Sequence, residues 1–198
     1  VHLVLARVAG APEGVKGISL FVVPKFLVDA DGSPGVRNDV QCVSIEHKLG
    51  IKASPTAVLQ FGDHGGAVGY LVGEENQGLA YMFVMMNAAR YAVGVQGIAV
   101  AERAYQLAAA YAKERVQGCP VDGSLPGAGP IIHHPDVKRM LLTMRAMTEG
   151  CRALALAAAA EYDHAHAHPD AAQRKRSQAA YEFLVPLVKG YSTEMSME

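Results

Sequence analysis

The chain has 198 residues, 51% hydrophobic and 19% charged, so it can bury a sizeable core and is not an intrinsically disordered polypeptide. A formal net charge of −1 argues against nucleic-acid partners, and no apolar run reaches the ~20 residues of a membrane-spanning helix, so no membrane insertion is expected. Three widely spaced cysteines fit free thiols in a reducing, cytoplasmic compartment better than a disulfide framework.

The first part of the chain has the pattern of an antiparallel β domain. Short β-rich runs alternate with turn clusters of Gly, Pro and Asp. The runs are VHLVLARVA, GISLFVV, VQCVSIE and AVLQF, and the turn clusters are GAPEG, DADGSPG and GDHGG. This pattern ends near residue 73, so residues 1–72 are predicted to form part of a β domain.

From residue 73 onward the apolar spacing changes to three or four residues, which predicts three helices of an incomplete antiparallel bundle. Helices are expected at residues 76–117, 135–168 and 170–193, and the Gly- and Pro-rich segment GCPVDGSLPGAGPII is expected to be a surface loop. Pro186 has no backbone N–H, so it is expected to kink or end the third helix. The predicted fold class is α+β, with a helical domain at residues 73–198.

Arg90 is the most unusual residue of the first predicted helix. Small and apolar residues flank it for more than a turn on each side, in the segment FVMMNAARYAVGVQG. An apolar row leads to it at helical spacing: Leu79, Met82, Phe83 and Met86. A buried guanidinium is costly unless an anion or hydrogen-bonding groups meet it. Two interpretations stay open: an Arg that reaches solvent or a carboxylate, and an Arg at a binding site.

A second polar group ends the same helix, where Lys113, Glu114, Arg115 and Gln117 occupy the last predicted turn. Cations at a helix C-terminus offset the partial negative charge of the exposed carbonyls, by about 0.3–1 kcal/mol each. This effect accounts for the cations without any ligand.

Two further patterns are weaker. His164 and His168 share a helix face at a spacing of four, but no third ligand stands near them, so no metal site is predicted. The turn EHKLGIKASPT carries Lys48 and Lys52 without a P-loop or GxGxxG pattern, so a solvated basic turn is preferred to a phosphate site.

The order of these segments resembles the junction between the β domain and the helical domain of acyl-CoA dehydrogenases. The resemblance rests on KLGIKASPTAVLQFGD, GYLVGEENQGLAYMFVMMNAARYAVGVQG and AYAKERVQG, extends over nearly the whole chain, and is strongest to a larger bacterial branch of the family. It implies FAD as cofactor and oxidation of acyl-CoA to trans-2-enoyl-CoA. It also implies an electron-transfer flavoprotein as electron acceptor and assembly as a homo-oligomer.

The resemblance assigns roles to four residues. Asn87 and Arg90 fill the places of a family Asp or Asn and an Arg that lie close to the acyl-CoA substrate. ERVQG resembles a family turn whose Arg contacts the flavin pyrophosphate across a subunit interface, which implies cofactor binding by Arg115 and Gln117. Gly118 follows directly, where an aromatic residue is common in the family.

No catalytic residue is predicted in the chain. The reaction needs a carboxylate base for the α-proton, and the family's usual base follows a Gly-Gly-rich turn that is not found here. Some members place a Glu directly before the helical Arg, but this position is Ala89. We therefore expect an internal fragment that is inactive by itself. Two alternatives remain: a non-catalytic acyl-CoA-binding or oligomerisation module, and an acyl-CoA oxidase.

Overall fold

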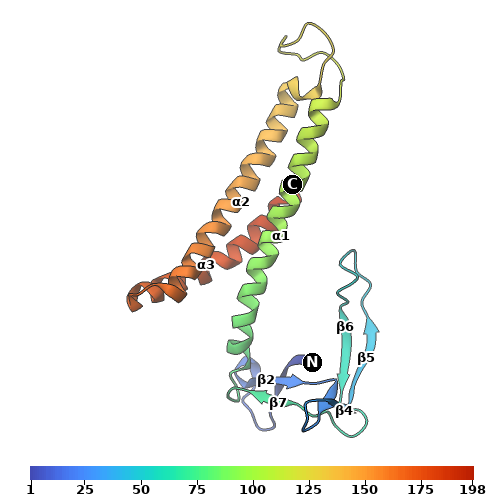
Figure 1. The fold of residues 1–198 in the computed structure, drawn as a ribbon, viewed down its shortest axis with the longest axis vertical. Helices are drawn as coiled ribbons and strands as arrows, with labels where there is room; N and C mark the ends of the chain where they lie inside the picture. Colours follow the sequence, from blue (N-terminus) through green and yellow to red (C-terminus); the bar gives the residue numbers. More distant parts are fainter. The chain divides into compact units, whose positions relative to one another are not determined.

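The computed structural model describes residues 1–198, which divide into two compact units, Val1–Val84 and Met85–Glu198. The division falls inside helix α1 (Gly78–Glu114), beyond the change of sequence pattern near residue 73. Figure 1 shows the strands in the first part of the chain and long helices in the second. The predicted α+β class is confirmed.

The first unit contains small antiparallel sheets, as the turn-rich sequence predicts. The strands are β1 (His2–Arg7), β2 (Ile18–Val23), β3 (Phe26–Val28), β4 (Pro34–Arg37), β5 (Val40–Ile45), β6 (Ala57–Phe61) and β7 (Tyr70–Val72). β2 is the central strand of a sheet in the order β1-β2-β7, while β3 pairs with β4 and β5 pairs with β6. Leu20 of β2 faces Leu5 on one side and Val72 on the other, and its side chain is buried.

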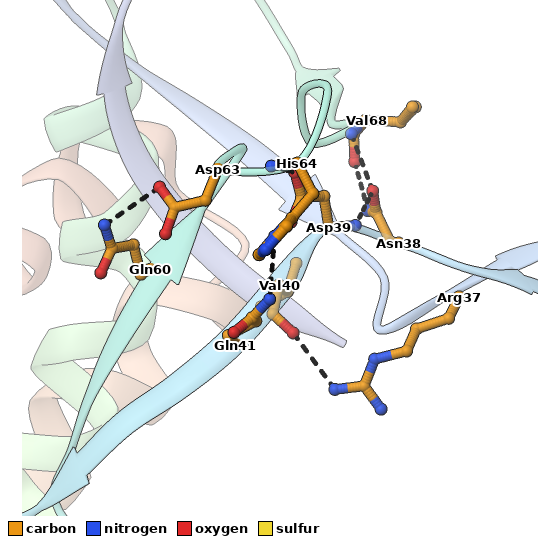
Figure 2. A network of polar contacts seen from close by, with 9 residues as sticks. All are labelled: Arg37, Asn38, Asp39, Val40, Gln41, Gln60, Asp63, His64 and Val68. Atoms are coloured by element: carbon orange, nitrogen blue, oxygen red, sulfur yellow. Dashed lines mark hydrogen bonds and ion pairs between the residues drawn. The ribbon is translucent and has the colours of Figure 1, made fainter.

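Asn38 links three segments of this unit through its buried side chain, which is 5% exposed. Its Nδ2 donates to the carbonyls of Pro24 and Val68, both at 2.8 Å. Its Oδ1 accepts from the N–H groups of Asp39 and Val68, at 3.0 and 2.9 Å (Figure 2). The carboxamide thus satisfies its own donors and acceptors while it fixes the end of β2, the start of β5 and the loop before β7.

Asp39 holds the same loop at a second point. The backbone N–H of His64 donates to Asp39 Oδ2 at 2.5 Å, and His64 Nδ1 lies 3.3 Å from Asp39 Oδ1. Gln41 Nε2 lies 3.0 Å from Nδ1 of the same imidazole (Figure 2). The hydrogen bond from the His64 amide lowers the pKa of Asp39 below its usual value, because it stabilises the charged carboxylate.

Helix α1 starts against β2, two residues later than the sequence predicts. Asn76 has a φ of +67°, outside the helical region, and its N–H donates to the buried Ser19 Oγ at 2.8 Å. Gly78 lies directly on the strand, since a Cβ there would be 2.4 Å from the Ser19 carbonyl carbon. A helix that began at residue 76 would lose both contacts.

The second unit is helical. Besides the main part of α1 it contains the short 3₁₀ helix η2 (Ile131–His133) and the long helices α2 (Pro135–Ala167) and α3 (Ala171–Met195). The predicted start of α2 is correct, and the other predicted ends of α2 and α3 differ from the observed ones by one or two residues. Helix α1 ends at Glu114 rather than at Gln117.

The expectation that Pro186 ends the third helix is wrong. The helix continues through Pro186 to Met195, although the proline ring removes a backbone hydrogen bond. Val185 and Val188 on either side of it are fully buried, and the burial of each such side chain is worth about 1.5–3 kcal/mol. This packing offsets the cost of the proline.

The core of the second unit lies where the three helices meet. α2 contributes Cys151, Ala155 and Ala158, while α1 contributes Ile98. On α3 the buried row contains Tyr181, Val185, Val188 and Ser192, whereas Tyr191 is exposed.

Helix α1 crosses α3 at two glycines. A Cβ on Gly94 would lie 2.7 Å from Val188 Cγ1 and 2.8 Å from the Val188 carbonyl oxygen. A Cβ on Gly97 would lie 2.8 Å from the Ser192 carbonyl oxygen. No larger residue fits at either position without moving the backbone of α3.

None of the helices is both long enough and apolar enough to cross a bilayer.

Replacement Gly94→Ala tests the helix crossing. Alanine favours a helix over glycine, but its methyl group overlaps Val188, so we expect the free energy of unfolding to fall by about 1–3 kcal/mol in urea titrations. The matched control is Gly150→Ala in α2, where a Cβ meets no atom within 4 Å. This control should gain up to about 1 kcal/mol. Equal gains in both variants would contradict the crossing.

Replacement Asp39→Asn tests the anionic contact with His64. Because the folded pKa of Asp39 is lowered, its stabilising effect is present above the unfolded value of about 3.9 and is lost as the pH falls through the folded value. We expect the variant to unfold at lower urea concentration than the parent at pH 5, with a smaller difference at pH 3. Asp63→Asn removes the same charge from the same loop and should show no such trend. A difference that persists unchanged at pH 3 would argue against the contact.

Candidate functional site

Asn87 and Arg90 come together on α1, as their spacing of three predicts. Arg90 Nη1 donates to Asn87 Oδ1 at 3.4 Å, and both residues are half-buried. The bond is long for an N–H···O contact. The pair combines a cation, an amide donor and an amide acceptor at one place on the helix.

The apolar row that leads to Arg90 is less buried than expected. Leu79, Met82 and Met86 are half-buried, and Phe83 is 42% exposed. Tyr91 packs against the core and donates its hydroxyl to the Ala155 carbonyl of α2 at 3.0 Å. This bond sets the rotation of α1 about its axis next to the Asn87–Arg90 pair.

Arg115 and Gln117 lie just beyond α1 rather than in its last turn. Their segment pairs with the chain that precedes η2: Ile131 N–H donates to the Arg115 carbonyl at 2.8 Å, and Gln117 N–H donates to the Gly129 carbonyl at 3.2 Å. Between them Val116 forms an antiparallel bridge with Pro130. These cross-strand bonds replace helical ones, which is why α1 ends at Glu114.

The extended backbone brings the two side chains to the same side of this short ladder, since residues two apart share a face. Arg115 Nη2 donates to Gln117 Oε1 at 3.4 Å, and both side chains are exposed. We call residues 115–118 the ladder turn. Gly118 closes it with a φ of +66°, a conformation that favours glycine.

The side chain of His134 also contacts the ladder turn. Its Nε2 lies 2.8 Å from the Gln117 carbonyl oxygen. The sequence indicated nothing of this contact, because a lone histidine at a loop end has no periodic signal and the two residues are far apart along the chain.

The remaining predicted patterns have ordinary structural roles. Lys48 Nζ donates to the Ser54 carbonyl at 2.5 Å and so closes its own turn. His164 and His168 have ring centroids 6.0 Å apart, and the Asp170 N–H donates to His168 Nδ1 at 3.1 Å. No group of three or more His, Cys, Asp or Glu side chains is arranged to hold a metal ion. Ala89 is exposed and brings no carboxylate to Arg90.

Comparison with known proteins decides the family. The sequence profile of "Acyl-CoA dehydrogenase, C-terminal domain" matches residues 76–198, more than half of the chain. The chain belongs to the acyl-CoA dehydrogenase family. The resemblance recognised in its motifs is thereby confirmed.

Curated members of the acyl-CoA dehydrogenase family match the whole chain. The 3-methylmercaptopropionyl-CoA dehydrogenase of Ruegeria pomeroyi is 61% identical over 198 residues, which are 100% of this chain and 33% of that protein. The chain therefore spans about one third of the length of the curated relatives that it matches.

Solved acyl-CoA dehydrogenase structures share the fold. Caenorhabditis elegans ACDH-11, in complex with C11-CoA, aligns with a TM-score of 0.77 and 26% identity over 98% of this chain and 30% of that chain. An acyl-CoA dehydrogenase from Bacillus anthracis, complexed with FAD, aligns with a TM-score of 0.72 and 24% identity over the same shares.

Proposed function

We propose that the protein to which this chain belongs oxidises an acyl-CoA thioester to the trans-2-enoyl-CoA, with FAD as cofactor and an electron-transfer flavoprotein as acceptor. The observation that supports this most is the 61% identity, along the entire chain, to a protein named for acyl-CoA dehydrogenation. The middle β domain then corresponds to residues 1–72 and the C-terminal helical domain to residues 73–198.

The chemistry of the ladder turn fits the pyrophosphate of FAD. The Arg115 guanidinium is exposed and makes a single long hydrogen bond, so its other N–H groups can pair with phosphate oxygens. Gln117 adds an amide donor. We propose that Arg115 and Gln117 hold the pyrophosphate. When bound, the flavin supplies the hydride acceptor of the reaction.

Asn87 and Arg90 are proposed to line the acyl-CoA cleft. A half-buried guanidinium presents several N–H donors, which can form charge-assisted hydrogen bonds to a ligand oxygen. Asn87 supports this guanidinium, because its Oδ1 accepts a hydrogen bond from Arg90 Nη1. Because Ala89 supplies no carboxylate, these residues bind and orient substrate while the α-proton passes to a base elsewhere. The isolated 198-residue chain is accordingly proposed to have no turnover.

The length of α1 favours a homo-oligomer. Arg90 and Arg115 are separated by 115 − 90 = 25 residues, about 37 Å at the helical rise of about 1.5 Å per residue. The flavin and the acyl-CoA must meet at one reaction centre. The two arginines can bind ligands at the same centre more readily if they belong to different subunits. The outer face of α3 offers an apolar row for such contacts: Phe183, Leu187 and Tyr191, all exposed. Exposed free Cys42 and Cys119 fit a cytoplasmic setting.

Replacement Arg115→Gln in the full-length protein tests the cofactor assignment. Loss of a charged hydrogen-bond partner should weaken FAD binding by about 1.5–3 kcal/mol without change in helical content. FAD occupancy after dialysis and the circular dichroism spectrum are the measurements. Lys113→Gln, which removes a cation from the same helix end, should cost only tenths of a kcal/mol. Equal FAD retention in both variants would leave Arg115 as a helix-end charge.

Replacement Arg90→Gln in the full-length protein tests the substrate assignment. We expect kcat/KM for acyl-CoA to fall at least tenfold, about 1.4 kcal/mol, with the fold retained. Arg103→Gln removes an exposed arginine from the same helix and should leave kcat/KM near that of the parent. Similar values for the Arg90 variant and the parent enzyme would remove Arg90 from the substrate site.

A further inference from the structure

We propose that His134 is a positioning residue for the cofactor: it holds the ladder turn in the conformation in which Arg115 and Gln117 receive the flavin pyrophosphate. This inference rests on the proposed function of that turn. Its side-chain hydrogen bond goes to the backbone carbonyl of Gln117 and to neither the guanidinium nor the carboxamide, so it acts through the backbone.

The contact has a defined direction. The Gln117 carbonyl oxygen only accepts hydrogen bonds, so His134 Nε2, at 2.8 Å, must carry the proton. In the neutral imidazole the lone pair then lies on Nδ1. The imidazole therefore serves here as a donor to a backbone carbonyl.

With this hydrogen bond, the backbone of Gln117 is held through both its N–H and its C=O. Its N–H is already used by the Gly129 carbonyl at 3.2 Å, and His134 takes its C=O, so both backbone groups of the residue are paired. The ring also lies against Gly118, where an added Cβ would be 3.6 Å from His134 Cε1. The end of the ladder turn is thus held by a hydrogen bond and by van der Waals contact.

His134 is itself firmly placed. It is the N-cap of α2, with extended φ and ψ of −68° and 130°, and Pro135 follows it in the first turn. Its N–H donates to the Ile131 carbonyl at 3.0 Å, and its carbonyl accepts from Lys138 N–H at 3.0 Å. The side chain makes no capping bond to α2. A residue fixed at a helix start has turned its side chain away from that helix and toward the ladder turn.

Preorganisation explains why such a contact affects cofactor binding. Arg115 and Gln117 are exposed, so without a rigid backbone they would lose conformational freedom when they meet the pyrophosphate. The ladder and His134 remove part of that loss before FAD arrives.

The test compares His134→Ala with His134→Gln in the full-length protein. The amide N–H of glutamine can reach the position of Nε2 and donate to the same carbonyl. His133→Ala is the matched control, since no side-chain hydrogen bond joins His133 to the turn. The measurements are the Kd for FAD, from titration of the apoprotein, and hydrogen exchange of the Gln117 amide. We expect His134→Ala to raise the Kd about 3- to 10-fold and to speed exchange, His134→Gln to restore both, and His133→Ala to change neither.

Arg115→Gln, measured in parallel, separates the two proposals. If Arg115→Gln weakens FAD binding and His134→Ala does not, the positioning role is overturned and the cofactor role of the turn stands. If neither variant changes the Kd, both are overturned. A His134→Gln variant as weak as His134→Ala would also overturn the hydrogen-bond role of His134.

Discussion

The backbone contact between α1 and α3 at Gly94 and Gly97 is the constraint from which the arrangement of the second unit follows. With no side chain between the helices, Val188 and Ser192 of α3 lie fully buried against α1. Close packing of this kind leaves few alternative rotations of α1, and the Tyr91 bond to α2 selects among them. The helix thereby becomes a fixed support for the polar residues along it.

The two proposed binding groups are held in place in different ways. Arg90 lies one turn before Gly94, so its orientation is set directly by the crossing and by Tyr91. The ladder turn lies beyond the helix, and its geometry comes from cross-strand bonds to residues 129–131 and from His134. A rigid helix presents Arg90, whereas a short hydrogen-bonded ladder presents Arg115.

The spacing of residues along the chain predicted those features of the fold that depend on residues close together in the sequence. The strands and the three helices followed from apolar periodicity. The ends of α1 could not be predicted in this way, since Asn76 is fixed by Ser19 and Arg115 by Ile131, both distant in sequence. His134 was missed for the same reason. Motif resemblance identified the family because ERVQG and NAAR keep recognisable residues where periodicity carries no information.

We propose above all that Arg90 and Asn87 on α1 bind the substrate and that Arg115 in the ladder turn beyond α1 binds the cofactor. A crystal structure of the full-length protein with FAD and a non-reactive acyl-CoA analogue would test both assignments at once. We expect flavin phosphate oxygens within about 3 Å of the Arg115 guanidinium, with Arg90 and Asn87 beside the acyl-CoA. FAD bound with Arg115 extended into solvent, and acyl-CoA bound away from Arg90, would contradict these assignments.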